Sequence, residues 1–226
     1  MSVETSGLAA DRALLGRTST AERVADVLRT RISEGFFPPG TRLAEDAIGS
    51  ALAVSRNTLR EAFRLLTHER LLAHELNRGV FVRVLSVADV IDIYRVRRMV
   101  ECAAVRGLTS APDLTAVQSA VQAGTVAAEA GEWQDLGTAN IRFHTAVAAL
   151  AGSTRVDELM RGILAELRLV FHVMADPRRF HEPYLLRNGE IAELLAAGDW
   201  PAAADMLAGY LADAERQLVE AYAELV

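Results

Sequence analysis

Three arginines spaced four residues apart, Arg56, Arg60 and Arg64, lie in the stretch VSRNTLREAFRLL at residues 54–66. On an α-helix this spacing places all three side chains along one face, beside a second face that carries the apolar residues. Arginine presents a planar fork of N–H donors that can bind a guanine edge or a phosphate. A basic row is also typical of a solvent-exposed face that is paired with acidic neighbours. The surrounding segments must therefore decide between a binding surface and a solvated one.

The overall composition limits the class of protein. The chain has 226 residues, of which 51% are hydrophobic, and a net charge of −6. This is enough apolar material for a folded core. No segment has the pattern of a signal peptide or of a membrane-spanning helix, so we expect a cytoplasmic protein with no membrane association. The single cysteine, Cys102, excludes an internal disulfide and a multi-cysteine metal cluster.

Charge is divided unevenly along the chain. All 24 basic residues are arginine, and residues 1–85 hold 12 of them against 10 of the 30 acidic residues. Residues 86–226 therefore carry the excess of negative charge. A modestly basic part joined to an acidic part favours a nucleic-acid-binding module fused to a regulatory or oligomerisation module.

The segments before the arginine row predict a helix-turn-helix. A capping box formed by Ser19 and Glu22 begins a helix that the apolar spacing extends to Gly35. The segment FFPPGTRL then predicts a turn, and a second short helix should run across Leu43 to Ala51. A short helix, a tight turn and a second amphipathic helix, here the arginine-bearing one, form the helix-turn-helix arrangement.

A β-hairpin should follow the arginine-bearing helix. Valines at every second position from Val80 to Val84 predict a strand, and NRG supplies the turn that joins it to the segment LLAHE. These elements together predict a winged helix-turn-helix domain over residues 19–84, preceded by a flexible arm at residues 1–18. The arginine face would enter the major groove of double-stranded DNA.

The segment GFFPPGTRLAEDAIGSALAVSRNTLREAFRLLTHERLLAHELNRGVFV also resembles the DNA-binding domain of the GntR family of bacterial transcription regulators. The resemblance implies that residues at the start of the arginine helix and at the wing tip contact operator DNA. These residues are Ser55, Arg56, Asn57, Thr58, Arg60, Arg78 and Gly79. Asp46 stands where some relatives have a DNA-contacting arginine, so that contact is not expected here. For Arg64, a solvated or phosphate-edge position is at least as well supported as a contact with a base.

Residues 86–226 are predicted to be helical almost throughout. Apolar residues recur at helical spacing, and capping, proline and glycine signals divide the region into segments. The expected helices cover residues 86–109, 112–130, 133–150, 154–174, 183–197 and 201–225. No strand pattern appears, so the region should form an all-α bundle of about six helices, and the protein should be mostly α. His181 should lie in a loop before the fifth of these helices.

Three segments of this half carry a second resemblance. YRVRRMVE at 94–101, NIRFHTAVAALAGS at 140–153 and IAELLAAGDWPAAADMLAGYL at 191–211 are similar to signatures of the FCD domain. This is the ligand-binding and dimerisation domain of the FadR subfamily of GntR regulators. The length of this half and its helix number resemble the shorter, VanR-like branch. The resemblance implies that residues 86–226 bind a small-molecule effector and form a homodimer.

The commonest form of the FCD domain binds a divalent metal through one Asp and three His. His144 is retained in this sequence, whereas Asn140, Asn188 and Tyr210 stand at the other three positions. Neutral amides and a phenol are poor ligands for such an ion, so we expect no metal and no other cofactor. Polar side chains that converge inside a bundle need partners. A metal-free effector pocket is therefore predicted.

Two charged residues of the first bundle helix complete this predicted pocket. Arg97 resembles the family arginine that points inward, and Glu101 lies one helical turn later on the same face. The guanidinium fork suits a carboxylate, so we expect a small anionic organic effector. The alternative is that Arg97 only forms an i, i+4 salt bridge with Glu101.

The functional prediction excludes an enzyme, because the sequence has no nucleophile elbow, zinc-protease, P-loop or dinucleotide-binding motif. We expect a homodimeric, ligand-responsive transcription regulator that binds a near-palindromic operator, because a twofold axis relates the two recognition helices. Repression is expected from the family resemblance alone. The alternative is a dimeric architectural DNA-binding protein that responds to no effector.

Overall fold

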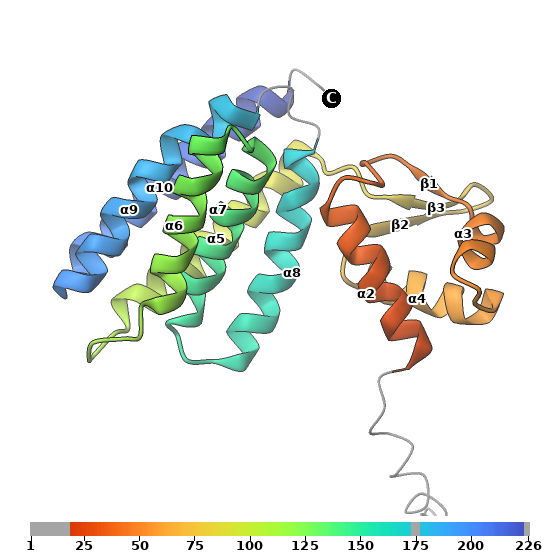
Figure 1. The fold of residues 1–226 in the computed structure, drawn as a ribbon, viewed down its shortest axis with the longest axis horizontal. Coiled ribbons are helices and arrows are strands. Elements are labelled where there is room, and N and C mark those ends of the chain that lie inside the picture. Colours follow the sequence, from red (N-terminus) through yellow and green to blue (C-terminus); the bar gives the residue numbers. More distant parts are fainter. Residues whose placement is uncertain (1–18, 173–176, 224–226) are drawn as a thin grey trace, which may run out of the picture. The chain divides into compact units, whose positions relative to one another are not determined.

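The computed structural model describes residues 19–172 and 177–223, so the arm expected at residues 1–18 lies outside the described part. The chain divides into two compact units, with the boundary between Arg83 and Val84. The first unit combines helices with a small sheet, and the second is helical (Figure 1). The prediction of a mostly α protein with a small β wing and an all-α second half is confirmed. Within the described ranges, no helix is both long and apolar enough to cross a membrane.

The first unit has the element order of a winged helix-turn-helix. Its elements are α2 (Thr20–Ser33), β1 (Arg42–Leu43), α3 (Glu45–Ala51), α4 (Arg56–His68), β2 (Leu72–Glu75) and β3 (Gly79–Val82). Strand β3 lies between β1 and β2 and is antiparallel to both. Helix α4 packs against α2, α3 and β2, and its apolar face, including Leu59, Phe63 and Leu66, is buried.

Side-chain caps begin two helices of this unit. The hydroxyl of Ser19 accepts from the backbone N–H of Glu22, and the Glu22 carboxylate accepts from the Ser19 N–H, so the predicted capping box is present at α2. Ser55 caps α4 in the same way by accepting from the N–H of Thr58 at 3.1 Å. Such caps satisfy N–H groups that have no partner within the helix.

Two sequence-based boundaries in this unit are wrong: the predicted strand runs to Val84 but β3 ends at Val82, and the second helix starts later than expected. The second helix does not run across Leu43, because that residue pairs with Val80 in β1 and α3 begins at Glu45. The reason is the sheet: without β1, one edge of β3 would have no strand beside it. The backbone N–H of Gly40 also donates to the carbonyl of Val82, which extends this contact toward the proline-rich turn.

The second unit is a bundle of helices in its described part. These are α5 (Val87–Arg106), α6 (Thr115–Ala130), α7 (Trp133–Ala149), α8 (Thr154–Phe171), α9 (Pro177–Ala197) and α10 (Trp200–Ala223). Helix α5 packs against α10, α7 and α8, and α9 packs against α6, α7 and α10. Helix α7 therefore has neighbours on several sides, and its side chains from Leu136 to Ala148 are largely buried.

Helix α9 begins six residues earlier than the sequence predicts, at Pro177 instead of Pro183. Proline was expected at the start of this helix because it has no N–H to donate. Inside α9, Pro183 leaves the carbonyl of Arg179 without its usual helical partner. The side chain of Gln217 on α10 donates to that carbonyl at 3.3 Å, which compensates for the missing bond. His181 consequently lies in a helix and not in a loop, so that prediction is wrong.

Candidate functional site

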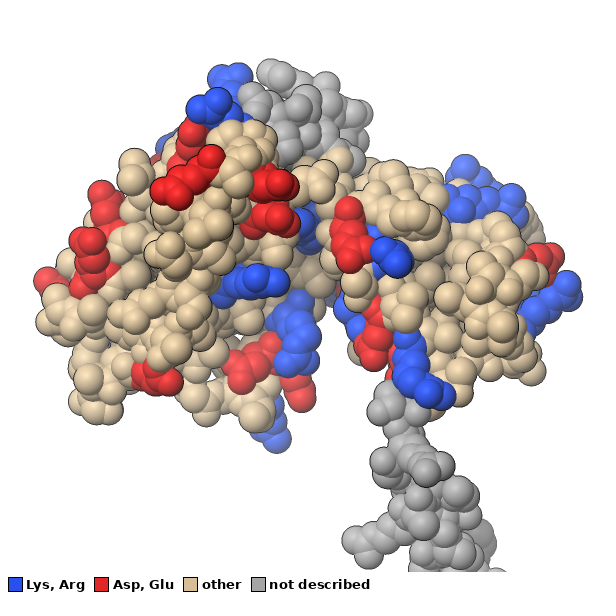
Figure 2. Space-filling view, in the orientation of Figure 1, with Lys and Arg blue, Asp and Glu red and all other residues tan. Residues whose placement is uncertain are grey.

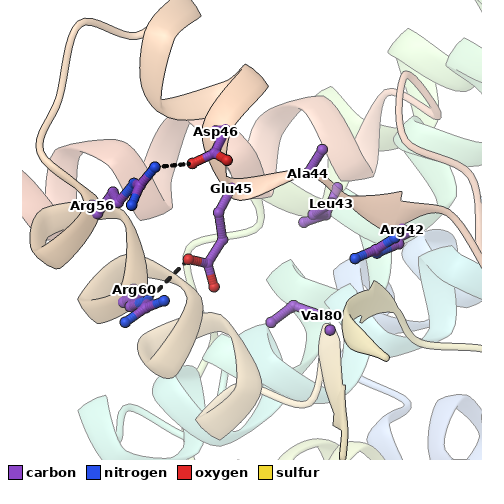
Figure 3. A pocket seen from close by; sticks show the side chains of 9 residues that line it. Arg42, Leu43, Ala44, Glu45, Asp46, Arg56, Arg60 and Val80 are labelled. Carbon is purple, nitrogen blue, oxygen red and sulfur yellow. Dashed lines mark hydrogen bonds and ion pairs between the residues drawn. The ribbon is translucent and has the colours of Figure 1, made fainter. Parts of the chain in front are cut away.

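The arginines of α4 stand on the surface, each beside an acidic residue. Arg56 and Arg60 are 73% and 66% exposed. Arg56 Nη2 lies 3.1 Å from the Asp46 carboxylate, and Arg60 Nε donates to Glu45 at 2.9 Å (Figure 3). Arg64 pairs within α4 with Glu61, at 2.6 Å. The two acidic partners from α3 were not expected from the sequence.

An open hollow of about 430 Å³ lies between the arginine helix and the small sheet. Its polar lining comes from β1, α3 and α4 (Figure 3), and Gly79 and Val80 of β3 line it as well. Three arginines line it together with two acidic residues; they are Arg42, Arg56, Arg60, Glu45 and Asp46. In the space-filling view, arginine side chains stand at the surface of this unit next to single acidic ones (Figure 2). The surface is therefore mixed in charge and not uniformly basic.

The other predicted DNA-contacting residues of this helix differ in availability. The Ser55 and Thr58 hydroxyls lie 2.8 Å apart and hydrogen-bond to each other, while Ser55 also caps α4. Their first role is thus to fix the start of the helix. Asn57 is exposed in the first turn, and no hydrogen bond ties its side chain to another described residue.

The predicted wing-tip residues lie at the turn between β2 and β3. Gly79 has a φ of 113°, which favours glycine, and an added Cβ would lie 3.2 Å from Arg42 Nε. Arg78 pairs with Glu75, and its guanidinium carbon lies 5.4 Å from the centre of the Phe81 ring. Arg78 is thus held at the tip of the hairpin by a carboxylate and a ring.

The six residues expected to bind an effector come together in the core of the helical unit. Helix α5 supplies Arg97 and Glu101, α7 supplies Asn140 and His144, α9 supplies Asn188, and α10 supplies Tyr210. None of the six is more than 8% exposed. The i, i+4 spacing on α5 and on α7 explains why each of these helices presents two members on one face. We call this set the buried polar cluster.

The charged part of the buried polar cluster is a chain of three side chains. Arg97 Nε donates to Glu101 Oε1 at 2.8 Å, so the i, i+4 pair weighed as the alternative does exist. Glu101 Oε2 lies 2.6 Å from His144 Nδ1. Burial alone would raise the pKa of the Glu101 carboxyl, but the Arg97 charge holds that pKa below its usual value. The Arg97 guanidinium also lies 4.8 Å from the centre of the Tyr94 ring.

The neutral part of the cluster continues from the other nitrogen of His144. His144 Nε2 lies 3.1 Å from the Tyr210 hydroxyl, which lies 2.9 Å from Asn140 Oδ1. Asn188 Nδ2 donates to the same Asn140 oxygen at 2.8 Å. The hydroxyl of Tyr210 has one proton, so it can donate either to His144 or to Asn140 but not to both.

The charge of His144 decides between these two directions. Burial lowers the pKa of the imidazole, so the ring is neutral at pH 7. Its single proton then lies on Nδ1, because the Glu101 carboxylate can only accept. Nε2 can accept from Tyr210 only if that hydroxyl turns away from Asn140 Oδ1, to which it donates in the structure. A doubly protonated His144 would donate from both nitrogens, and Tyr210 would then donate to Asn140. The proton on His144 is therefore coupled to the orientation of the Tyr210 hydroxyl.

Two atoms of the buried polar cluster have no hydrogen-bond partner among the described residues. They are Arg97 Nη2, a donor, and Asn188 Oδ1, an acceptor. Buried polar atoms without partners are unfavourable, because they have lost water and gained nothing in return. Such atoms are where a ligand or an ordered water can bind.

The donor chemistry of the cluster does not fit the divalent metal of the commonest FCD domain. Both nitrogens of His144 already have partners in Glu101 and Tyr210, so a metal ion would have to break one of these contacts. Among residues 19–172 and 177–223, no group of three or more His, Cys, Asp or Glu side chains could hold a metal ion.

A second buried histidine was missed by the sequence analysis. His181 on α9 is 3% exposed, packs edge-on against Phe171 and Phe180, and has no hydrogen-bond partner for Nδ1 within the described part of the chain. Burial lowers its pKa to about 3. The helical spacing of Phe180, Tyr184 and Asn188 was the signal that α9 begins before Pro183.

Comparison with known proteins gives the same division of the chain. The model of bacterial regulatory proteins of the gntR family matches residues 20–82, and the FCD domain model matches residues 92–213. A solved transcriptional regulator GntR from Rhodococcus sp. RHA1 is 52% identical, with a TM-score of 0.88 over 91% of this chain and 100% of that chain.

Two curated relatives have names that refer to repression. The gluconate operon transcriptional repressor of Bacillus subtilis is 38% identical over 87 residues, which is 38% of this chain and 35% of that protein. The chain thus spans about a third of the length of that relative. A Paenarthrobacter nicotinovorans protein named for repression of D-xylose utilization is 26% identical over 193 residues, or 82% of both chains.

Proposed function

The chain belongs to the GntR family of bacterial regulatory proteins and carries an FCD domain, and we propose that it is a homodimeric, ligand-responsive repressor. The observation that carries this proposal is the combination of two separate sites. One is an exposed arginine surface on a winged helix-turn-helix, and the other is a buried polar cluster with two unpartnered atoms in the helical unit. The family is one of regulators and not of enzymes.

The DNA-binding part of the proposal rests on α4 and the wing. Arg56 and Arg60 stand on the exposed face of α4, and each can give a fork of N–H donors to a guanine edge. Asn57 in the first turn can reach a base edge or a phosphate, and the wing tip at Arg78 and Gly79 suits the adjacent minor groove. In a twofold dimer the two copies of α4 require a near-palindromic operator.

Replacing Arg56 by alanine is expected to weaken operator binding by about 1–3 kcal/mol and to relax the sequence preference, because a bidentate base contact is lost. The measurement is the dissociation constant for a duplex that the wild-type protein enriches from a randomised pool, compared with a scrambled duplex of equal length. Arg64→Ala is the matched control, since Arg64 is an exposed arginine of the same helix that lies eight residues after Arg56, beyond the first turn. Equal weakening on both duplexes would make Arg56 a phosphate contact.

The effector part of the proposal rests on the two unpartnered atoms. The Arg97 guanidinium donates from Nε to Glu101, and its Nη2 has no partner among the described residues. Nη2 can therefore donate to one oxygen of a carboxylate. Asn188 Oδ1 can accept from a hydroxyl or amine of the same molecule. We therefore propose a small carboxylate that also carries a hydrogen-bond donor, bound without a metal.

A panel of mono- and dicarboxylates with and without hydroxyl groups tests this site by thermal shift. A binding carboxylate should raise the melting temperature of the wild-type protein equally with and without chelator. Arg97→Lys should abolish this rise, because lysine can still pair with Glu101 but lacks the guanidinium fork. If the rise in melting temperature is lost in the presence of chelator, the carboxylate binds through a metal ion and the metal-free site is wrong. If Arg97→Lys shows the same rise in melting temperature as the wild-type protein, then Arg97 does not bind the carboxylate. If no carboxylate changes the affinity for the operator, the architectural alternative is favoured.

A further inference from the structure

Two acidic residues on α3 hold the α4 arginines through different atoms (Figure 3). Glu45 accepts from Nε of Arg60, so both terminal nitrogens of that guanidinium lie outside this hydrogen bond. Asp46 lies instead against Nη2 of Arg56, one of the two terminal nitrogens that would form the fork to a base. Any DNA group that binds the terminal nitrogens of Arg56 would therefore lie close to the Asp46 carboxylate.

The charge of the DNA group decides whether this sharing is favourable. The edge of guanine is neutral, so Arg56 can meet a base acceptor while its charge stays beside the Asp46 carboxylate, with which it forms an ion pair. A phosphate is an anion and would be brought close to the Asp46 carboxylate, where like charges repel. Asp46 is 78% exposed in the free protein, so it faces the same solvent as the arginine that it pairs with.

We propose that Asp46 is a specificity-determining residue of the DNA-binding surface: its carboxylate permits Arg56 to contact a neutral base edge and opposes its contact with phosphate. The inference rests on the proposed operator binding by α4. It assigns to Asp46 the suppression of sequence-independent binding, which is otherwise driven by arginine–phosphate contacts. A repulsive group of this kind improves discrimination by weakening the wrong complex more than the right one.

A local structural role for Asp46 makes a different prediction. Asp46 lies in the first turn of α3, whose N-cap Ala44 supplies no side-chain hydrogen bond, so the carboxylate could simply favour that helix terminus. In that case its replacement would lower the thermal stability of the first unit. It would not alter binding in a way that depends on the DNA sequence.

The test compares Asp46→Asn with Asp26→Asn in the full-length protein. Asparagine keeps the shape of the side chain and removes the charge, and Asp26 is an exposed residue of α2 that pairs with Arg29 in the same unit. Both variants thus change the net charge equally. The probes are the duplex enriched by the wild-type protein and its scrambled version, with affinity measured over a range of salt concentrations.

Relative to Asp26→Asn, Asp46→Asn should tighten binding to scrambled DNA about 10-fold, because Arg56 gains a phosphate contact there. Binding to the enriched duplex should tighten at most about 3-fold, because Arg56 already contacts a base in that complex. The salt dependence on scrambled DNA should steepen by a slope of about 0.9, as one added phosphate contact requires. In an Arg56→Ala background, Asp46→Asn should behave like Asp26→Asn on both duplexes.

Three results would overturn the inference. The first is that Asp46→Asn raises the affinity for both duplexes equally. The second is that Asp46→Asn and Asp26→Asn have the same affinities in the wild-type background. The third is that Asp46→Asn still raises the affinity for scrambled DNA in the Arg56→Ala background. They differ from a failure of the proposed function itself, in which the wild-type protein would enrich no duplex from the randomised pool.

Discussion

Replacing Glu101 by glutamine is expected to destabilise the helical unit by about 3–5 kcal/mol, because it leaves the buried charge of Arg97 without its counter-ion. Arg97 is 1% exposed and Glu101 is fully buried, so water cannot take over the lost interaction. Glutamine preserves the volume of the side chain, which separates the loss of charge from the creation of a cavity. Urea denaturation followed by tryptophan fluorescence measures the effect, since both tryptophans, Trp133 and Trp200, lie in this unit.

The same helix supplies a control for this prediction. Asp92 pairs with Arg95 on α5 at 3.2 Å, but both side chains are about 60% exposed, so Asp92→Asn should change the free energy of unfolding by less than about 1 kcal/mol. Combining Glu101→Gln with Arg97→Met should recover part of the lost stability, because it removes the uncompensated charge. If Glu101→Gln costs no more than Asp92→Asn, then Glu101 is not what keeps Arg97 charged inside the bundle.

The positions of most helices could be predicted because their signals are local. The capping boxes at Ser19 and at Ser86 involve residues three apart, and each begins a helix whose buried face follows from apolar spacing. The spacing of Arg97 with Glu101 likewise fixes a shared face on one helix. These inferences need only the few residues around each position.

The parts that could not be predicted depend on contacts between distant elements. Strand β1 exists because Leu43 meets Val80, thirty-seven residues later in the chain, and two residues alone have no strand pattern. The pairing of Arg56 with Asp46 depends on how α3 packs against α4. The assembly of the buried polar cluster from four helices was expected only from a family resemblance. Apolar spacing shows which face of a helix is buried, but it does not show which other helix that face contacts.

Lowering the pH from 7 to 5 is expected to destabilise the helical unit, because its two buried histidines are held neutral. The pKa of His181 is lowered to about 3 and that of His144 is lowered as well, in both cases first of all by burial. A histidine in the unfolded chain has a pKa of about 6.5. Below that pH the unfolded state binds more protons than the folded state, so the stability falls as the pH falls.

The size and the window of this effect follow from the same linkage. His181 stays neutral in the folded protein at pH 5, so it alone should remove about 2 kcal/mol between pH 6.5 and pH 5, and His144 adds a loss of the same sign. Glu101 does not interfere, because its lowered pKa gives a stabilisation that is lost only as the pH falls below its usual range.

Unfolding by urea at pH 7 and pH 5, followed by the fluorescence of Trp133 and Trp200, measures this loss in the helical unit. His181→Gln should reduce the difference between the two pH values by about 2 kcal/mol, since it removes a group that can be protonated only on unfolding. His74→Gln changes an exposed histidine of the other unit and should leave the difference unchanged. A pH dependence that is the same in His181→Gln and in the wild-type protein would mean that His181 is already accessible to protons in the folded bundle.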